Sequence, residues 1–280
     1  MGVFAPAGVF DPARLEAGLE RLRAWGFEPV PAPNLGRHQR YLAGTDAERL
    51  ADLRWALFGE GLDAAWLARG GYGITRLLPS LPEAGFPRRA VLGFSDASAL
   101  FAALWRRGAG PLVHGPVLQS LTDHTDPASQ EALRALLCEG RGWSWPCREI
   151  IPGAAFGRLV GGNLCTLASL AGTPDALRAE GAIMILEEVG ERPYRVDRLL
   201  TQLLGAGTFD GVAAVVLGAF VGCTESGQPD WDAEQIAVEV LGGLGVPVAA
   251  GLPVGHGPQN HAFCWGAGAT LRDGVLSWGR

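Results

Sequence analysis

Apolar residues in the first two-thirds of the chain fall into short continuous runs that alternate with stretches of helical periodicity. The first helix is the clearest, because Asp11 is a typical N-cap, Pro12 suits the first helical position, and apolar side chains recur at positions 15, 19, 22 and 25. The same patterns predict strands at residues 3–5, 64–67 and 90–94 and helices at residues 47–58, 74–78 and 98–106. This alternation predicts an α/β domain with a mainly parallel sheet.

The pattern changes between residues 122 and 155. A helix is predicted at residues 130–137, and a stretch rich in glycine, tryptophan and proline follows at residues 140–152. We therefore predict an N-terminal α/β domain at residues 1–139, a linker at residues 140–156 and a C-terminal domain at residues 157–280. If the linker is mobile, closure of the two domains would assemble the site.

The C-terminal domain is predicted to be an α/β domain richer in strands. Its apolar runs predict strands at residues 158–160, 182–186, 212–217 and 246–250 and a terminal hairpin near residues 269–278. Helical periodicity predicts helices at residues 163–171, 196–204 and 232–241.

Composition and charge restrict the class of protein. The 280 residues are 48% hydrophobic and 19% charged, which is enough apolar material for one large core or two modest ones. The net charge of -6 argues against a protein that binds nucleic acid or coats an anionic membrane. The longest apolar runs are too short to span a bilayer and no secretory leader is found, so we expect a cytoplasmic protein.

Two residue types exclude whole classes of chemistry. The 23 Lys and Arg residues are all arginine, which excludes Schiff-base catalysis, a pyridoxal phosphate anchor, a Ser-Lys dyad and a P-loop lysine. The five cysteines are odd in number and include no C-x-x-C pair, which fits neither a disulfide framework nor a zinc site. We expect no metal and no cofactor, so any nucleophile must be activated by another side chain.

Ser95 is the first candidate for catalysis. The segment at residues 91–97 is a predicted strand that ends in a Gly-x-Ser turn and runs directly into a helix. A serine at such a junction is presented on a tight turn, and the helix N-terminus supplies backbone N–H groups for an oxyanion. The alternative is that Ser95 or Asp96 only caps the helix.

A glycine-rich segment is the second candidate. Gly70, Gly71 and Gly73 follow a predicted strand and precede a short helix. Three glycines in four positions let backbone N–H groups turn inward as an anion-binding nest, which can stabilise a tetrahedral intermediate. The alternative is that they only provide the positive φ angles of a turn.

A carboxylate and a histidine follow two later strands. Glu187 comes at the carboxyl end of a predicted strand, where it could orient a histidine, and His256 lies between glycines just after the strand at residues 246–250. An imidazole there suits a general base, although both groups could simply face solvent. The remaining histidines are His114, in a His-Gly-Pro turn, and His38, His124 and His261, which have no evident partners.

These motifs combine a serine, a glutamate and a histidine with a glycine nest. With lysine chemistry excluded, the combination points to acyl transfer by a Ser-His-Glu triad. Motif order alone leaves two architectures open, an α/β-hydrolase or an enzyme with the serine in one domain and the Glu and His in another.

At these residues the chain resembles the LD-carboxypeptidase (muramoyltetrapeptide carboxypeptidase) family of serine peptidases, which also contains the microcin C immunity proteins. The resemblance runs nearly from end to end. It is carried by residues 3–7, 69–73, 76–78, 93–96, 114–116, 161–164, 172–174, 186–187, 193–198 and 255–257 with Asn260.

The resemblance implies roles for particular residues. Ser95 would be the nucleophile, His256 the general base and Glu187 the group that orients it, while the backbone N–H groups of Asp96 and Gly71 would form the oxyanion hole. It also implies an N-terminal α/β domain, a C-terminal β-rich, swivelling barrel-like α/β domain and a homodimer. The implied activity is metal-free release of terminal D-alanine from murein tetrapeptides during cell-wall recycling in the cytoplasm.

An arginine is expected to bind the terminal carboxylate of the small peptide substrate, since the chain has no lysine. Arg69, Arg192 and Arg195 are candidates, and Tyr72 in the glycine segment is a further substrate-binding candidate. Arg195 could instead form a salt bridge on its own helix. Two alternative functions stay open: a microcin-type peptidase that cleaves peptidyl-nucleotide amides, and a non-catalytic module that binds muropeptides.

Overall fold

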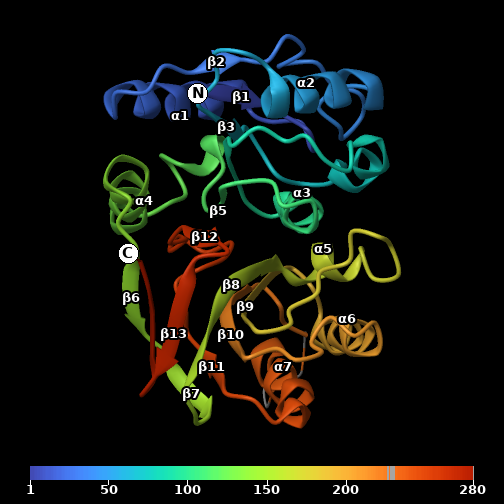
Figure 1. Cartoon of the computed structure of the whole chain (residues 1–280), viewed down its shortest axis with the longest axis vertical. Coiled ribbons are helices and arrows are strands. Elements are labelled where there is room, and N and C mark those ends of the chain that lie inside the picture. The colour runs from blue at the N-terminus through green and yellow to red at the C-terminus, as the bar shows by residue number, and fades with distance from the viewer. Residues whose placement is uncertain (226, 228–230, 280) are drawn as a thin grey trace.

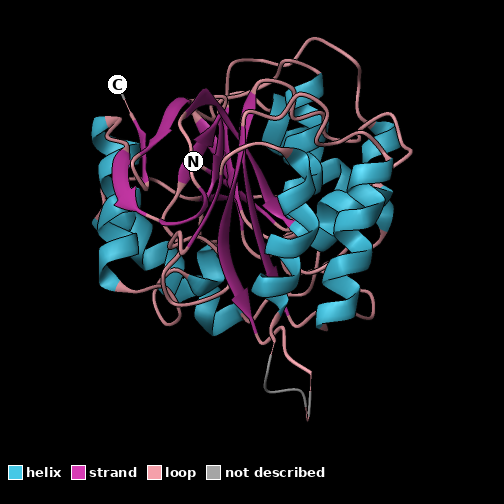
Figure 2. Ribbon diagram, turned by 90° about the horizontal axis from the view of Figure 1, so that it is seen from below, coloured by secondary structure: helices cyan, strands magenta, loops and turns pink. Residues whose placement is uncertain are grey.

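The structure contains two β-sheets, and Figures 1 and 2 show helices on both sides of the central strands. This computed structural model describes residues 1–225, 227 and 231–279. The first sheet has the strand order β12-β5-β4-β3-β1-β2. Its parallel strands are β1 (Gly2–Phe4), β2 (Val30–Pro31), β3 (Ala64–Leu67), β4 (Ala90–Gly93) and β5 (Leu112–His114), and β12 (Phe263–Trp265) pairs antiparallel with β5. The predicted mainly parallel α/β sheet is confirmed, although the sequence patterns miss β2, β5 and β12.

The helices of this half begin where the local chemistry favours a helix start. They are α1 (Pro12–Ala24), α2 (Asp46–Phe58), α3 (Ala97–Arg106) and α4 (Pro127–Glu139), with the short 3₁₀ turn η3 (Leu118–Ser120). Asp11 caps α1 by accepting a hydrogen bond from the Ala13 N–H at 2.8 Å, as predicted. The helix predicted at residues 74–78 instead forms two 3₁₀ turns, η1 (Ile74–Arg76) and η2 (Leu78–Ser80), because Pro79 has no N–H with which to continue an α-helix.

The second sheet has eight strands in the order β6-β14-β13-β8-β9-β10-β11-β7. Its parallel centre consists of β8 (Ala155–Asn163), β9 (Ala182–Val189), β10 (Ala214–Val221) and β11 (Val248–Ala250), and β13 (Gly268–Arg272) and β14 (Val275–Trp278) form the predicted terminal hairpin. The helices α5 (Leu164–Ala168), α6 (Pro193–Gly205) and α7 (Ala233–Leu241) and the turn η4 (Gly242–Leu244) lie together beside it (Figure 1). The β-rich C-terminal α/β architecture is therefore confirmed.

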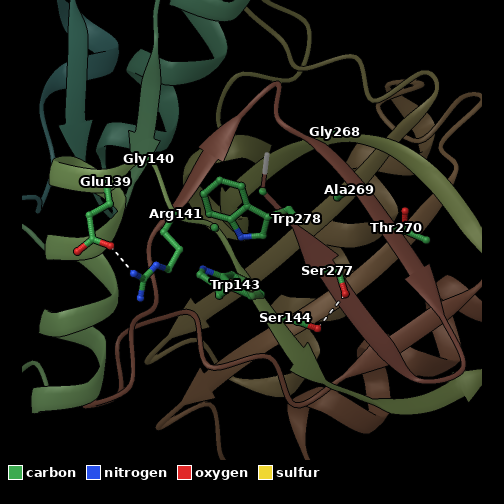
Figure 3. Close-up of a pocket in the computed structure, with 12 residues that line it drawn as sticks. Glu139, Gly140, Arg141, Trp143, Ser144, Gly268, Ala269, Thr270, Ser277 and Trp278 are labelled. Atoms are coloured by element: carbon green, nitrogen blue, oxygen red, sulfur yellow. Dashed lines mark hydrogen bonds and ion pairs between the residues drawn. The ribbon is translucent and has the colours of Figure 1, made fainter.

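Residues 140–156, predicted as a linker, contain β6 (Trp143–Pro146), β7 (Arg148–Ile151) and the start of β8. In the pairing of β6 with β14, Trp143 lies opposite Trp278, and the Ser144 and Ser277 hydroxyl oxygens are 2.8 Å apart (Figure 3). β7 pairs with β11 at the other edge of the sheet. Because one residue separates β6 from β7, the two edges are joined and the sheet curves into a nearly closed barrel. Hydrogen bonds to β14 and β11 therefore hold this segment in the sheet, whereas a mobile linker would make no such bonds.

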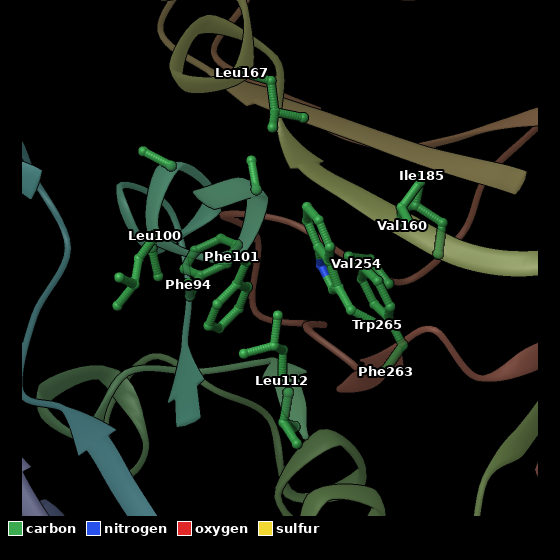
Figure 4. Packing of buried hydrophobic residues seen from close by; sticks show 14 of the residues in the cluster. Phe94, Leu100, Phe101, Leu112, Val160, Leu167, Ile185, Val254, Phe263 and Trp265 are labelled. Atoms are coloured by element: carbon green, nitrogen blue, oxygen red, sulfur yellow. The ribbon is translucent and has the colours of Figure 1, made fainter. Parts of the chain in front are cut away.

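Apolar side chains from the two halves pack together where the halves meet (Figure 4). Phe101 of α3 packs against Trp265 of β12 with ring centroids 5.9 Å apart. Strand β12 belongs to the C-terminal half of the chain but extends the first sheet, with Phe263 opposite His114. This pairing anchors residues 251–262 over the first sheet. No helix in the described ranges is both long and apolar enough to cross a membrane.

Candidate active site

Ser95 occupies the turn between β4 and α3. Its φ of 64° lies in the left-handed region that residues other than glycine rarely adopt, so the backbone is strained as in a nucleophile elbow. Gly70 lies directly against this turn, since a Cβ added to Gly70 would be 2.8 Å from Ser95 Cβ. The close approach brings the glycine-rich loop next to the serine hydroxyl.

His256 lies between Ser95 and Glu187. Its Nε2 is 3.1 Å from Ser95 Oγ, and its Nδ1 is 2.7 Å from Glu187 Oε2. Its ring also packs on Phe94, with ring centroids 4.3 Å apart. The structure therefore brings together the three predicted catalytic side chains, in the order nucleophile, base and orienting carboxylate.

Glu187 is fully buried on β9, beside an irregular part of β10. The ladder between these strands shifts register between Leu217 and Phe220, which contains Gly218 and Ala219. The Ala219 N–H donates to the Val254 carbonyl at 2.8 Å, and a Cβ on Gly218 would overlap that same carbonyl. The irregularity and the glycine thus allow the His256 loop to approach the carboxylate.

Glu188 is also buried but has different partners. Its carboxylate accepts hydrogen bonds from Asn163 Nδ2 at 3.0 Å and from the Cys165 N–H at 2.7 Å. Burial raises the pKa of Glu188. Of the two adjacent glutamates, Glu187 reaches the histidine and Glu188 fixes the start of α5.

The loop that carries His256 is held by side chains from the first half of the chain. The Asn260 N–H donates to Ser129 Oγ at 3.0 Å, and Asn260 Oδ1 accepts from the Gly255 N–H at 3.4 Å. His124 Nε2 lies 2.8 Å from the His256 carbonyl oxygen. No local pattern in the sequence indicates this partner of His124, because the two residues are 132 positions apart in the chain.

His114 lies beneath the site in an apolar environment. It is fully buried, stacks on Phe263 with ring centroids 4.8 Å apart, and meets Phe94 edge-on at 5.2 Å. Within residues 1–225, 227 and 231–279, neither of its ring nitrogens has a hydrogen-bond partner. Burial, with a smaller effect from nearby His256, lowers the pKa of His114 to about 3. The ring is therefore neutral at physiological pH.

Two backbone N–H groups border the serine. The Asp96 N–H follows Ser95 directly, and Gly71 lines the same cavity as Ser95. Neither N–H donates to another group in the described part of the chain. Both N–H groups are thus free to donate to a bound oxyanion.

A cavity of about 490 Å³ opens over Ser95 and His256. Of the four predicted substrate-binding residues, Arg69 lines this cavity, and its guanidinium donates to the Val9 carbonyl. Arg14, which the sequence analysis does not single out, also lines the cavity and pairs with Asp123 at 2.6 Å.

The other three predicted substrate-binding residues do not line the cavity. Tyr72 is half exposed, and its ring centroid is 6.1 Å from that of Tyr41. Arg192 and Arg195, at the start of α6, pair with glutamates at 3.8 and 3.3 Å. Of the three candidate arginines, Arg69 lines the cavity with Ser95 and His256, and Arg192 and Arg195 do not.

A larger hollow of about 790 Å³ lies between the end of α4 and strands β6, β13 and β14 (Figure 3). It is lined by Trp143, Trp278 and the ion pair of Glu139 with Arg141. None of the predicted catalytic residues lines it. Because Ser95 and His256 both line the smaller cavity and neither lines this hollow, we place the candidate active site in the smaller cavity. Within the described ranges, no group of three or more His, Cys, Asp or Glu residues could hold a metal ion.

Comparison with known proteins places the whole chain in one group. The LD-carboxypeptidase N-terminal domain matches residues 1–115, and the LD-carboxypeptidase C-terminal domain matches residues 156–271. The murein tetrapeptide carboxypeptidase of Pseudomonas aeruginosa is 38% identical over 99% of this chain and 94% of its own length. The Microcin C7 self-immunity protein MccF of Escherichia coli is 26% identical over 90% of this chain and 83% of its own.

A solved structure shows the same relationship. The muramoyltetrapeptide carboxypeptidase from Oxalobacter formigenes superposes with a TM-score of 0.88 and 28% sequence identity, covering 100% of this chain and 98% of that chain. The two-sheet fold and these matches define a peptidase. The chain belongs to the LD-carboxypeptidase family.

Proposed function

We propose that this protein is a serine-type LD-carboxypeptidase that releases the terminal D-alanine of murein tetrapeptides through a Ser-His-Glu triad. One observation carries the proposal: Ser95, His256 and Glu187 form a continuous hydrogen-bonded relay. The identity of 38% to a murein tetrapeptide carboxypeptidase supports the choice of substrate.

In the first half of the reaction, His256 Nε2 takes the Ser95 hydroxyl proton while Oγ attacks the scissile carbonyl carbon. Glu187, fully buried and 2.7 Å from Nδ1, holds the ring in orientation and stabilises the imidazolium that forms. The Asp96 and Gly71 N–H groups donate to the oxyanion.

In the second half, the tetrahedral intermediate collapses and the C–N bond breaks. His256 gives its proton to the nitrogen of the departing D-alanine, which leaves an acyl ester on Ser95. A water molecule then attacks the ester carbonyl, His256 accepts its proton, and the released serine oxygen takes that proton back. The products are the tripeptide and D-alanine, and no metal is required.

Arg69 is the residue we propose for the substrate's terminal carboxylate. It lines the cavity that contains Ser95 and His256, whereas Arg192 and Arg195 do not. A guanidinium can bind a carboxylate through two parallel hydrogen bonds.

The test is mass spectrometry of a purified murein tetrapeptide incubated with EDTA and either the native protein or Ser95→Ala. Loss of one alanine with the native protein alone is expected. Loss with both proteins would remove Ser95 from the mechanism. An intact tetrapeptide, together with cleavage of a peptidyl-nucleotide amide, would assign the microcin-type activity instead, and binding of the tetrapeptide without cleavage of either would indicate a binding module.

The family resemblance also supports a role in cell-wall recycling, a cytoplasmic location and a homodimeric state. Light scattering coupled to size-exclusion chromatography tests the dimer, since a mass of 29.4 kDa would be that of a single chain. Fractionation of cells that produce the protein tests its location.

A further inference from the structure

The peptide bond between Gly73 and Ile74 is held at both ends by buried charged side chains. Asp96 Oδ2 accepts a hydrogen bond from the Ile74 N–H at 2.9 Å. Arg49 Nη1 donates to the Gly73 carbonyl at 2.9 Å. A carboxylate and a guanidinium thus bind the N–H and the C=O of one peptide group, two residues after Gly71.

The residue at position 73 fits this arrangement only as glycine. Gly73 has a φ of 139°, and a Cβ at this position would be 2.6 Å from Arg49 Nη1. The loop backbone therefore lies directly against both charged groups.

Burial removes water from the charges of Asp96 and Arg49, which costs free energy. Their hydrogen bonds within the protein must compensate for this cost. Asp96 is 3% exposed and Arg49 is 1% exposed. Arg49 also donates to the Pro6 carbonyl and to Asp46 Oδ1, the latter at 2.6 Å. Burial raises the pKa of Asp96 to about 6, which leaves the carboxyl ionised above neutral pH.

Asp96 connects the two donors of the oxyanion hole. Its own N–H is one donor, and its side chain holds the loop that presents the other, the Gly71 N–H. We propose that the Asp96 carboxylate and the Arg49 guanidinium are positioning residues that set the distance between these two donors. The inference rests on the proposed function, because it assumes that an oxyanion forms beside Ser95.

The test compares Asp96→Asn with the native enzyme in two assays. The first measures kcat and KM for D-alanine release from the murein tetrapeptide. The second measures the rate constant for labelling of Ser95 by a fluorophosphonate. Ser95 Oγ attacks phosphorus and displaces fluoride, and the phosphoryl oxygen gains negative charge in the same hole during this attack, whatever the natural substrate is. Since loss of one oxyanion donor lowers kcat about 10²–10³-fold, displacement of one should lower both rates about 10–100-fold. KM should change less than about two-fold, because the donors act on the transition state.

Asp52→Asn is the matched control. Asp52 is 3% exposed and accepts from the Asn34 N–H at 3.1 Å and from Asn34 Nδ2 at 2.9 Å, and burial raises the pKa of Asp52 as it does that of Asp96. Within the described residues, its hydrogen bonds go to Asn34 and none reaches the glycine loop. Ser95 of the Asp52→Asn variant should be labelled at about the native rate. Thermal melts should show that both variants are folded.

The outcomes separate this inference from the proposed function. Native labelling rates in Asp96→Asn, or equal losses in Asp96→Asn and Asp52→Asn, would overturn the positioning role. If the native protein releases no D-alanine, the proposed substrate is wrong, while the ratio of labelling rates still decides the role of Asp96. Should Asp96→Asn fail to fold, Arg49→Gln tests the other side of the same peptide group and should slow labelling in the same way.

Discussion

Ser95 Oγ and His256 Nε2 are 3.1 Å apart although 161 residues separate them in the chain. They meet because β12, shortly after His256, pairs with β5 of the first sheet, whereas Ser95 follows the neighbouring strand β4. The proposed nucleophile and the proposed base are therefore aligned by a strand pairing between the two halves. Contacts that hold β12 in place should affect catalysis as well as stability.

Glu187→Gln should lower kcat for D-alanine release about 10³–10⁴-fold, because a neutral amide cannot stabilise the His256 imidazolium and can favour the wrong tautomer. Glu188→Gln is the matched control, since Glu188 is adjacent and buried but binds Asn163 and the Cys165 N–H. It should lower the free energy of unfolding by about 1–3 kcal/mol and keep kcat near native. Steady-state kinetics and denaturant melts measure both effects. Equal kcat losses in the two variants would contradict the assignment of Glu187.

Gly218→Ala should impair both stability and activity. A Cβ at this position would overlap the Val254 carbonyl and push away the loop that carries His256. We expect a loss of about 1–3 kcal/mol in the free energy of unfolding and a fall in kcat. Gly243→Ala is the control, because no atom lies within 4 Å of a Cβ added there. Urea melts and initial rates of D-alanine release compare them, and a native kcat for Gly218→Ala would show that the loop adapts.

His114 should make the protein less stable in acid. Its folded-state pKa of about 3 is below the value of about 6.5 for an unfolded histidine, so the unfolded chain binds an extra proton as the pH falls through 6.5. Stability is thus fully present above about pH 6.5 and is lost progressively toward pH 3, by about 2 kcal/mol at pH 5. In His114→Phe this loss should be absent.

The measurement for His114 is the free energy of unfolding of both proteins by urea at about pH 7.5 and pH 5. The native protein should lose about 2 kcal/mol more than His114→Phe over this range. The other titratable groups are common to both proteins and cancel in the difference. Parallel pH profiles would mean that His114 is solvated or protonated in the folded state.

Arg69→Met should raise KM for the tetrapeptide about 10–100-fold, because a charge-assisted hydrogen bond to the substrate carboxylate is lost. Arg195→Met, at a position outside the cavity, should have a KM near native. A tetrapeptide with a C-terminal amide provides the second comparison, since the native enzyme should discriminate against it and Arg69→Met should not. Retained discrimination in Arg69→Met would assign carboxylate binding to another residue, with cavity-lining Arg14 the next to test.

Much of the fold could be predicted from local patterns. The period of apolar residues and the Asp11-Pro12 start locate the early helices, and continuous apolar runs locate β3, β4 and β9. One sequence signal is misleading. The Trp-rich stretch at residues 140–156 reads as a linker but forms β6 and β7, because its strands are short and their partners lie more than 90 residues away.

Part of the candidate site could likewise be predicted from the sequence, and part could not. Ser95, Glu187 and His256 could be named from the sequence, because each follows a predicted strand in a motif that suits its chemistry and matches the family resemblance. The support of His256 by His124, the pairing of Arg49 with the Gly73 carbonyl and the choice of Arg69 among the arginines could not be named. The sequence by itself determined which residues are candidates for the chemistry and where most of the longer helices and strands lie, since these depend on side-chain type and near neighbours. Only the tertiary structure decided which distant segments meet, since sheet pairing and burial depend on the free energy of the whole fold.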